Sequence, residues 1–261
     1  MINRLIEVLG KDFMFWYGLV CVVLFGLCIG SFLNVVIFRL IKKESLYKES
    51  SHCMKCLNKI KWYDNIPLVS YIVLKGKCRS CGTKISLQYP LVETLNALLC
   101  VFIYIKYGYS LYTLCYCVLV SVGICIAVID LRTLEIEPHL QIVLLLLGVI
   151  VCIIDRNNIL LHIVGAVCLS LLFLLIYFFT GGNGIGFGDV KLIALLGIIV
   201  GWKDIYVGFI VSAVIACVVE NIRKSKTGES RFAFGPYLVM GAYLGLFLGE
   251  PLFNWYFGIF A

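Results

Sequence analysis

Long apolar runs separated by short polar segments dominate the sequence. The first run, residues 13–38, has no charged side chain between Asp12 and Arg39. It is longer than the apolar core of a signal peptide and no small-residue cleavage site follows it, so we expect a retained transmembrane helix. The pattern predicts an all-α polytopic membrane protein with about eight transmembrane helices, several of them short for a hydrocarbon core of about 30 Å. The seven further charge-poor runs lie at about residues 91–105, 107–129, 140–154, 159–179, 188–201, 205–219 and 235–249.

The composition excludes an ordinary soluble domain. Hydrophobic residues make up 62% of the 261 residues, charged residues only 14%, and the mean hydropathy is +1.01. Soluble globular domains contain about 25% charged residues. We see no internal repeat and no low-complexity tract.

Basic residues set the predicted orientation. If the segment after the first helix is cytoplasmic and sides alternate along eight helices, 17 of the 22 Lys and Arg residues lie inside. The positive-inside rule favours this arrangement. It places two acids at similar depth on the cytoplasmic side, Asp130 at the end of the third helix and Asp189 at the start of the sixth.

Residues 39–90 form the only sizeable segment predicted outside the membrane, and they contain two CxxC pairs. This spacing suits a tetrahedral zinc site in which each pair supplies two thiolates from one turn. Four thiolates leave no open coordination position, so we expect a structural metal that holds together a segment too small to fold unaided. Two disulfides are the alternative, which a reducing cytoplasm disfavours. The expected ligands are Cys53, Cys56, Cys78 and Cys81.

The segment that holds the two CxxC pairs is also strongly basic. Between Arg39 and Lys84 there are 11 basic side chains and three acidic ones. A four-thiolate zinc centre adds about two negative charges, so the segment stays cationic and suits anionic lipid headgroups, although topology determination alone explains most of the charge. No interleaving of aromatic and basic residues points to nucleic acid. The other nine of the 13 cysteines lie in apolar runs, where cysteine acts as a small hydrophobe.

Glycines come directly before the second of the two cytoplasmic acids, Asp189. An ionisable group at the end of a membrane helix is a functional candidate, because placing it there is costly. Gly184, Gly186 and Gly188 remove side chains in front of Asp189 and permit close approach of another backbone. Together with Asp130 this predicts an aspartyl protease arrangement, in which two carboxylates share one proton and activate water.

Several motifs together carry a family resemblance. The sequence resembles the prepilin peptidase family, the type IV prepilin leader peptidases, which are polytopic GxGD aspartic proteases. The GxGD signature is also similar to presenilin and signal peptide peptidase, but the last helix here has no PAL motif. The matching stretches are GSFLNVVIFRL (30–40), WYDNIPLVSYIVLKGKC (62–78), ISLQYPLVE (85–93), GFGDVKL (186–192) and FGPYL (234–238).

The resemblance implies an activity and a location. Members remove a short basic leader from prepilin and pseudopilin precursors at the cytoplasmic face of the bacterial inner membrane. Those with the cysteine-bearing loop also methylate the new N-terminus from S-adenosylmethionine. The implied domains are an N-terminal transmembrane helix (1–38), a zinc-ribbon-like cytoplasmic domain (39–90) and a transmembrane protease core (91–261). The partners would be the precursors and membrane lipids, with no nucleic acid.

The resemblance also assigns roles to residues. Asp130 and Asp189 would be the catalytic pair, Gly186 and Gly188 the loop glycines of the active site, and the four CxxC cysteines the metal ligands. Lys191 belongs to the motif, but a lysine that only reaches the membrane interface is an equally ordinary explanation. No residue can be assigned to S-adenosylmethionine.

Two further positions of the family pattern leave questions open. Glu93 could face the active site or simply be a carboxylate at a helix start. The family commonly shows Ile-Pro after the first aspartate, whereas this chain reads Ile136, Glu137, Pro138, which puts the entry into the next helix in doubt.

Two other classes of function compete with a protease. A proton-coupled transporter would use the acids as a relay, but it predicts ionisable groups near the bilayer midplane and repeated halves with broken helices. A noncatalytic membrane scaffold leaves the glycines before Asp189 unexplained. The sequence does not identify the precursors or the pilus, secretion or DNA-uptake system that they serve.

Overall fold

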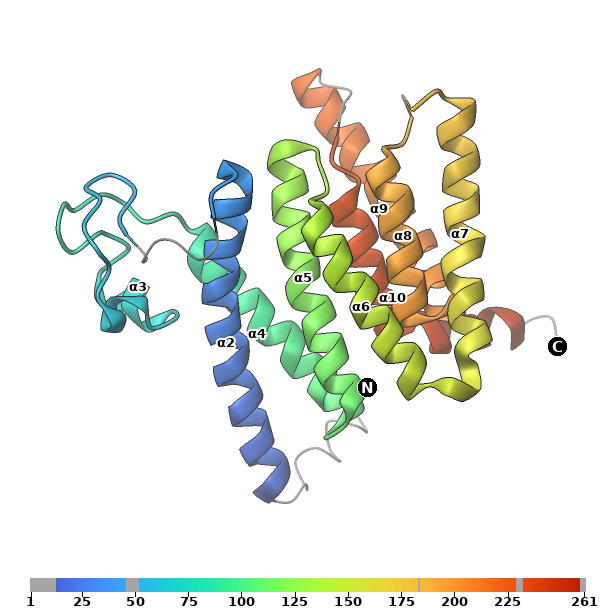
Figure 1. Ribbon diagram of the computed structural model, residues 1–261, viewed down its shortest axis with the longest axis horizontal. Helices are drawn as coiled ribbons and strands as arrows, with labels where there is room; N and C mark the ends of the chain where they lie inside the picture. Colours follow the sequence, from blue (N-terminus) through green and yellow to red (C-terminus); the bar gives the residue numbers. More distant parts are fainter. Residues whose placement is uncertain (1–12, 46–51, 183, 229–231, 259–261) are drawn as a thin grey trace. The chain divides into compact units, whose positions relative to one another are not determined.

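The computed structural model describes residues 13–45, 52–182, 184–228 and 232–258. Their regular structure is helical, with two isolated β-bridges and no strand among them. Each of the eight predicted apolar runs overlaps one long helix, so the predicted all-α architecture is confirmed for this part of the chain (Figure 1). The helices are α2 (Phe13–Lys42), α4 (Gln88–Tyr107), α5 (Leu111–Thr133), α6 (Pro138–Ile154), α7 (Ile159–Phe179), α8 (Phe187–Val200), α9 (Trp202–Thr227) and α10 (Gly235–Gly258).

Six of these helices, rather than the expected eight, are long and apolar enough to cross a membrane: α2, α4, α5, α7, α9 and α10. With 17 residues α6 is about 26 Å long, and with 14 residues α8 is about 21 Å long, at 1.5 Å per residue. Both fall short of a hydrocarbon core of about 30 Å. The protein is therefore an integral membrane protein whose described residues contain six candidate spans, and a count of eight stays a prediction.

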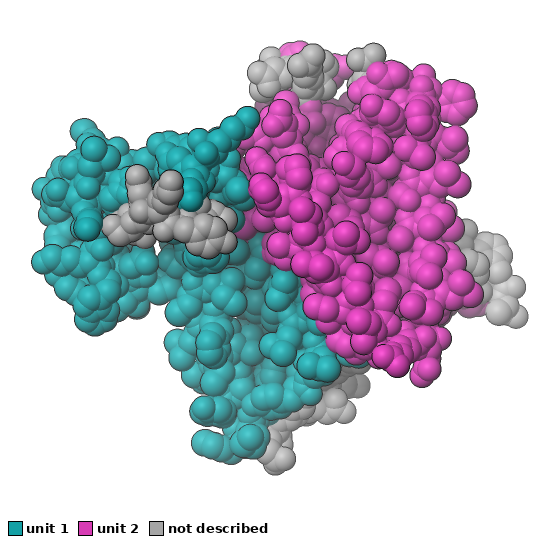
Figure 2. Space-filling model, viewed as in Figure 1, with its two compact units in different colours: residues 1–121 teal, residues 122–261 magenta. Residues whose placement is uncertain are grey.

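The chain forms two compact units, residues 1–121 and 122–261 (Figure 2). In the first unit α2 packs along α4. The contact is close because a methyl group on Gly30 would lie 2.7 Å from the Cα of Glu93. Polar side chains add to it, since the Asn96 amide donates to the carbonyl of Gly26 at 2.7 Å. Small residues and interhelical hydrogen bonds are the usual means of helix association in lipid, where hydrophobicity gives no driving force.

The first unit also contains the segment between α2 and α4. Its regular elements in the described residues are two single turns, η1 (Trp62–Asn65) and α3 (Val69–Val73), and a bridge at each CxxC pair, His52 with Lys59 and Lys77 with Lys84. A zinc ribbon is not shown by these short elements, and the predicted domain boundaries at residues 38 and 90 stay predictions.

In the second unit α8 contacts α6, α7, α9 and α10. Its side chains are buried around the helix, with Leu192, Leu196 and Ile199 at 0% exposure. The approach to α7 is close, since a methyl group on Gly165 would lie 2.8 Å from the carbonyl oxygen of Gly197. This burial explains why α8 is apolar around its whole circumference.

Candidate active site and metal centre

Asp130 lies in the last turn of α5 and is 4% exposed. Its Oδ2 accepts a hydrogen bond of 2.8 Å from the backbone N–H of Gly235, the first residue of α10. A Cβ atom on Gly235 would lie 2.6 Å from this oxygen, so the close approach requires glycine. The buried carboxylate is thereby fixed against the positive end of the α10 dipole.

Asp189 lies in the first turn of α8 and is half-buried. The helix is preceded by Gly186, whose backbone is extended, and the N–H of Asp189 donates to the carbonyl of Gly186 at 3.0 Å. The Asp189 carboxylate folds back over Gly186, because a Cβ there would come within 3.2 Å of Oδ2. The glycines of the GxGD stretch therefore leave room for the carboxylate itself.

Asp130 and Asp189 both belong to the second unit, and their charges interact. The charge of Asp130 acts on the carboxyl group of Asp189, although the two residues come from separate helices, α5 and α8. Two carboxylates whose charges interact disfavour each other's ionisation. Such a pair can hold a water molecule between an acid and a base.

The connection between α5 and α6 covers the GxGD stretch. A Cβ on Gly188 would lie 3.5 Å from the Ile136 side chain. Glu137 precedes α6 with an extended backbone and Pro138 is its first residue, a position that favours proline. The departure from the family's Ile-Pro spacing thus leaves a regular entry into α6.

Lys191 and Glu93 have other neighbours than the two aspartates. The Lys191 side chain is exposed, and its ammonium lies 4.8 Å from the centre of the Phe187 ring in a cation–π contact. Glu93, 6% exposed, belongs to the first unit, where its Oε2 accepts a hydrogen bond of 2.9 Å from the N–H of Leu68. These contacts favour interfacial anchoring for Lys191 and attachment of the α2–α4 segment for Glu93.

No role was predicted from the sequence for the residues that hold the start of α10. The Tyr237 hydroxyl donates to Oε1 of Glu220 on α9 at 2.8 Å, and Arg223 Nε donates to Oε2 at 2.6 Å. Phe234 stacks on Phe173 of α7 at 6.0 Å. The FGPYL motif carried the only available signal, since its glycine stands directly before a helix-initiating proline.

The four CxxC cysteines form a cluster suited to a metal ion. Their Sγ atoms all lie within 4.8 Å of one another, and those of Cys53 and Cys81 are 3.8 Å apart. Tetrahedral zinc with Zn–S bonds of about 2.3 Å places sulfurs about 3.8 Å apart, so the residues fit the metal. No other cluster of this kind occurs in the described ranges.

The two CxxC turns are built alike. The N–H of Cys53 donates to the Asn58 carbonyl at 2.9 Å, and the N–H of Cys78 donates to the Thr83 carbonyl at 2.8 Å. The residue after each second cysteine, Leu57 or Gly82, has a positive φ, of 58° and 68°. The stretches HCMKCLNKI and KCRSCGTKI thus form a short internal repeat, which corrects the expectation that the chain has none.

Hydrogen bonds to sulfur prepare the cluster for a cation. Backbone N–H groups of Cys56 and Lys55 lower the pKa of Cys53, and the side chain and N–H of Thr83 lower the pKa of Cys81 to about 6. The pKa of Cys56 behaves differently: Asn58 lowers it, but burial and the neighbouring thiols outweigh this and raise it to about 11. A divalent ion at the cluster would therefore have to displace the proton of Cys56.

Comparison with known proteins agrees with these observations. The family model of the bacterial peptidase A24 N-terminal domain matches residues 24–107, and that of the type IV leader peptidase family matches residues 117–220. No solved structure shows significant similarity.

Curated relatives match over most of their length. A prepilin leader peptidase/N-methyltransferase of Neisseria gonorrhoeae is 36% identical over 84% of this chain and 86% of its own. Proteins of the same name from Legionella pneumophila and Pseudomonas aeruginosa are 29% and 31% identical, covering 93% and 90% of this chain and 96% and 92% of their own. The chain therefore belongs to the type IV leader peptidase family.

Proposed function

We propose that this protein is a membrane aspartic endopeptidase that removes the basic leader of type IV prepilin-like precursors. The observation that carries the proposal is the approach of Asp130 and Asp189 from two helices of one unit, with the Gly235 N–H on Asp130. One carboxylate acts as base toward water while the protonated partner polarises the scissile carbonyl. The names and coverage of the curated relatives support the choice of substrate.

The position of the pair suits a substrate with a polar leader and an apolar helix. Asp130 is in the last turn of a candidate span and Asp189 in the first turn of an apolar helix. A carboxylate pair at helix ends meets a peptide bond where a membrane helix joins a polar segment. The distribution of basic residues supports the inner membrane, with the pair and the cysteine cluster facing the cytoplasm.

The cysteine cluster serves as a structural zinc site in this proposal. Four thiolates complete a tetrahedral shell, so the zinc has no position left for water or substrate. It would hold together residues 52–87, which contain no long helix or strand. N-methylation of the new N-terminus, with S-adenosylmethionine as donor, is supported by the second half of the relatives' name.

The test compares wild type with Asp130→Asn and Asp189→Asn on a full-length precursor that carries a basic leader and a hydrophobic helix. Each substitution is expected to lower leader removal by at least about 1,000-fold, because residues that act as a unit fail together. Glu250→Gln, an exposed acid in α10, is the matched control and should cleave normally. Normal cleavage by either aspartate variant would remove that residue from the mechanism.

The same reaction tests the second activity. With S-adenosylmethionine present, the mass of the cleaved product should rise by one methyl group. A cleaved but unmethylated product would limit the proposal to the protease.

A further inference from the structure

The short helix α3 exposes an apolar face. Its residues Val69, Ile72 and Val73 are 53%, 73% and 66% exposed. Positions i, i+3 and i+4 share one side of a helix, so these side chains form a single strip, here called the α3 face. Three large aliphatic side chains on one turn are too costly to leave in water without a reason.

The start of α3 is attached to a candidate membrane span. The Leu68 N–H, directly before α3, donates to Oε2 of Glu93 at 2.9 Å. Glu93 is in the second turn of α4, which begins at Gln88, and it is 6% exposed. Because α4 enters the membrane at this end, the bond holds α3 at the level where the lipid headgroups begin.

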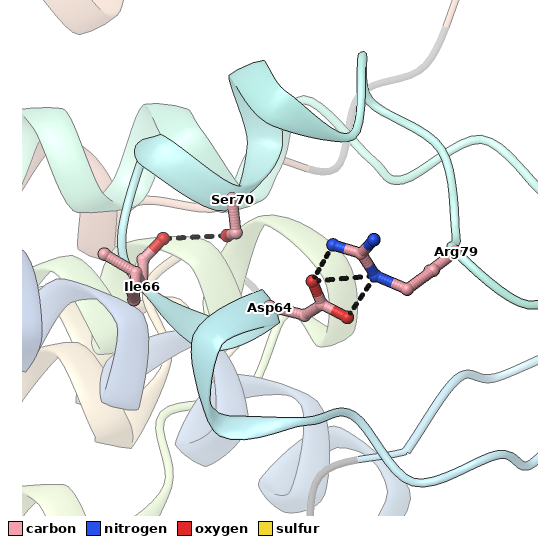
Figure 3. Close-up of polar contacts among 4 residues, drawn as sticks. All are labelled: Asp64, Ile66, Ser70 and Arg79. Atoms are coloured by element: carbon pink, nitrogen blue, oxygen red, sulfur yellow. Dashed lines mark hydrogen bonds and ion pairs between the residues drawn. The ribbon is translucent and has the colours of Figure 1, made fainter.

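The η1 turn that precedes α3 is linked to the cysteine-bearing segment. Asp64 of η1 accepts three hydrogen bonds from Arg79, which lies between Cys78 and Cys81 in the chain (Figure 3). Arg79 Nε donates to Oδ2 at 2.8 Å and to Oδ1 at 3.1 Å, and Nη2 donates to Oδ1 at 2.6 Å. The Ser70 hydroxyl donates to the Ile66 carbonyl at 2.7 Å (Figure 3). The hydrogen bonds from Arg79 lower the pKa of Asp64. These hydrogen bonds hold in place the segment that carries the α3 face.

Charge identifies the surface that this face meets. Residues 52–87 contain seven Lys and Arg side chains and a single acid, Asp64. Lys75 and Lys77 follow α3 directly, and Trp62, 80% exposed, precedes it. Lysines attract anionic headgroups by about 1 kcal/mol each near the surface, and tryptophan favours the membrane interface.

We propose that the α3 face docks on the anionic lipid surface of the membrane that α2 and α4 span. An apolar strip beside lysines is the pattern of an interfacial helix, which buries its apolar side at the boundary between headgroups and acyl chains. The attachment through Leu68 and Glu93 makes this docking intramolecular, so one turn is sufficient where a free helix would need more area. The proposal is independent of the catalytic assignment.

The test places a fluorescent probe on the α3 face of the full-length protein in lipid nanodiscs. Ile72→Trp is compared with Leu57→Trp, an equally accessible site at the first CxxC turn, 70% exposed. The fluorescence of the wild-type protein is subtracted from that of each variant, which leaves the emission of the added tryptophan. This emission is measured in discs of phosphatidylglycerol with and without bromine on the acyl chains. The Ile72→Trp probe should lose roughly half of its added emission, because an interfacial helix lies about 5–10 Å into the acyl boundary, and the Leu57→Trp probe should lose none.

Charge is tested on the same probe. Reversing the charge of both lysines (Lys75→Glu with Lys77→Glu) should reduce the quenching of the probe in anionic discs. With both lysines intact, the probe should be quenched less in discs of phosphatidylcholine than in anionic discs. An unquenched Ile72→Trp probe in both lipids would overturn the proposal. Equal quenching in both lipids would overturn its electrostatic part. Shielding of the probe by an added precursor, without lipid quenching, would assign the face to the substrate helix instead.

Discussion

The backbone N–H of Gly235 donates a hydrogen bond of 2.8 Å to Asp130, 105 residues earlier in the chain. This hydrogen bond joins the start of α10 to the end of α5. Its donor is a backbone N–H, which cannot rotate away from the carboxylate as a side-chain donor could. The position of Asp130 thus depends on how the first turn of α10 is held.

Gly235→Ala tests this dependence. The new Cβ would lie 2.6 Å from Oδ2, so either the carboxylate or the first turn of α10 must move. We expect leader cleavage to fall about 100-fold, since a displacement of roughly 1 Å at reacting groups can cost that much. Gly258→Ala, at the open end of the same helix with no atom within 4 Å, should cleave at the wild-type rate. Full activity of Gly235→Ala would show that Asp130 tolerates the shift.

The contact between Tyr237 and Glu220 should help to hold the first turn of α10, and through it the Gly235 N–H that binds Asp130. Tyr237→Phe removes a hydrogen bond of 2.8 Å two residues after Gly235, so we expect kcat to fall by up to about tenfold while KM stays constant. Adding Glu220→Gln to Tyr237→Phe should cost less than the sum of the two single losses, because both changes weaken the contact between these residues, while Glu220→Gln also weakens the ion pair with Arg223. Tyr206→Phe, at a 49% exposed position of α9, is the control. Additive losses would place the two residues in separate roles.

The two CxxC turns predict opposite effects at equivalent positions. Leu57 has a φ of 58°, and its counterpart Gly82 has a φ of 68°, with no heavy atom within 4 Å of the place that a Cβ would take. Left-handed backbone costs a residue with a Cβ about 1–2 kcal/mol. Leu57→Gly should therefore strengthen zinc retention against a chelator by about tenfold, and Gly82→Leu should weaken it by a similar factor. Equal zinc retention in the two variants would contradict the equivalence of the two CxxC turns.

Loss of one ligand should release the metal and loosen the segment that it holds. Cys81→Ser is expected to lower zinc content from about one ion per chain, because the remaining three thiolates no longer close the tetrahedral shell. Trypsin should then cut faster at the lysines and arginine of residues 55–84. Cys28→Ser, at an exposed cysteine of α2, should change neither zinc content nor the cleavage pattern. Unaltered zinc in Cys81→Ser would exclude this residue as a ligand.

The sequence alone determined the helices and the chemistry that they carry. The eight apolar runs became helices because local hydrophobicity and spacing decide that element. The CxxC pairs gathered because each turn is local and the segment between them is short. The glycines before Asp189 marked a place without side chains, where the room at Gly186 is taken by the Asp189 carboxylate, and the expected approach of another backbone stays a prediction.

The tertiary structure decided how the apolar helices pack and how α5 and α8 place the two aspartates. Four neighbouring helices bury α8, a 14-residue apolar run, and hydropathy alone does not indicate this burial. The approach of Asp189 to Asp130, the Gly235 donor and the attachment of Glu93 to Leu68 all join residues far apart in the chain. Such contacts depend on helix packing and loop closure, and no local pattern of residues encodes them.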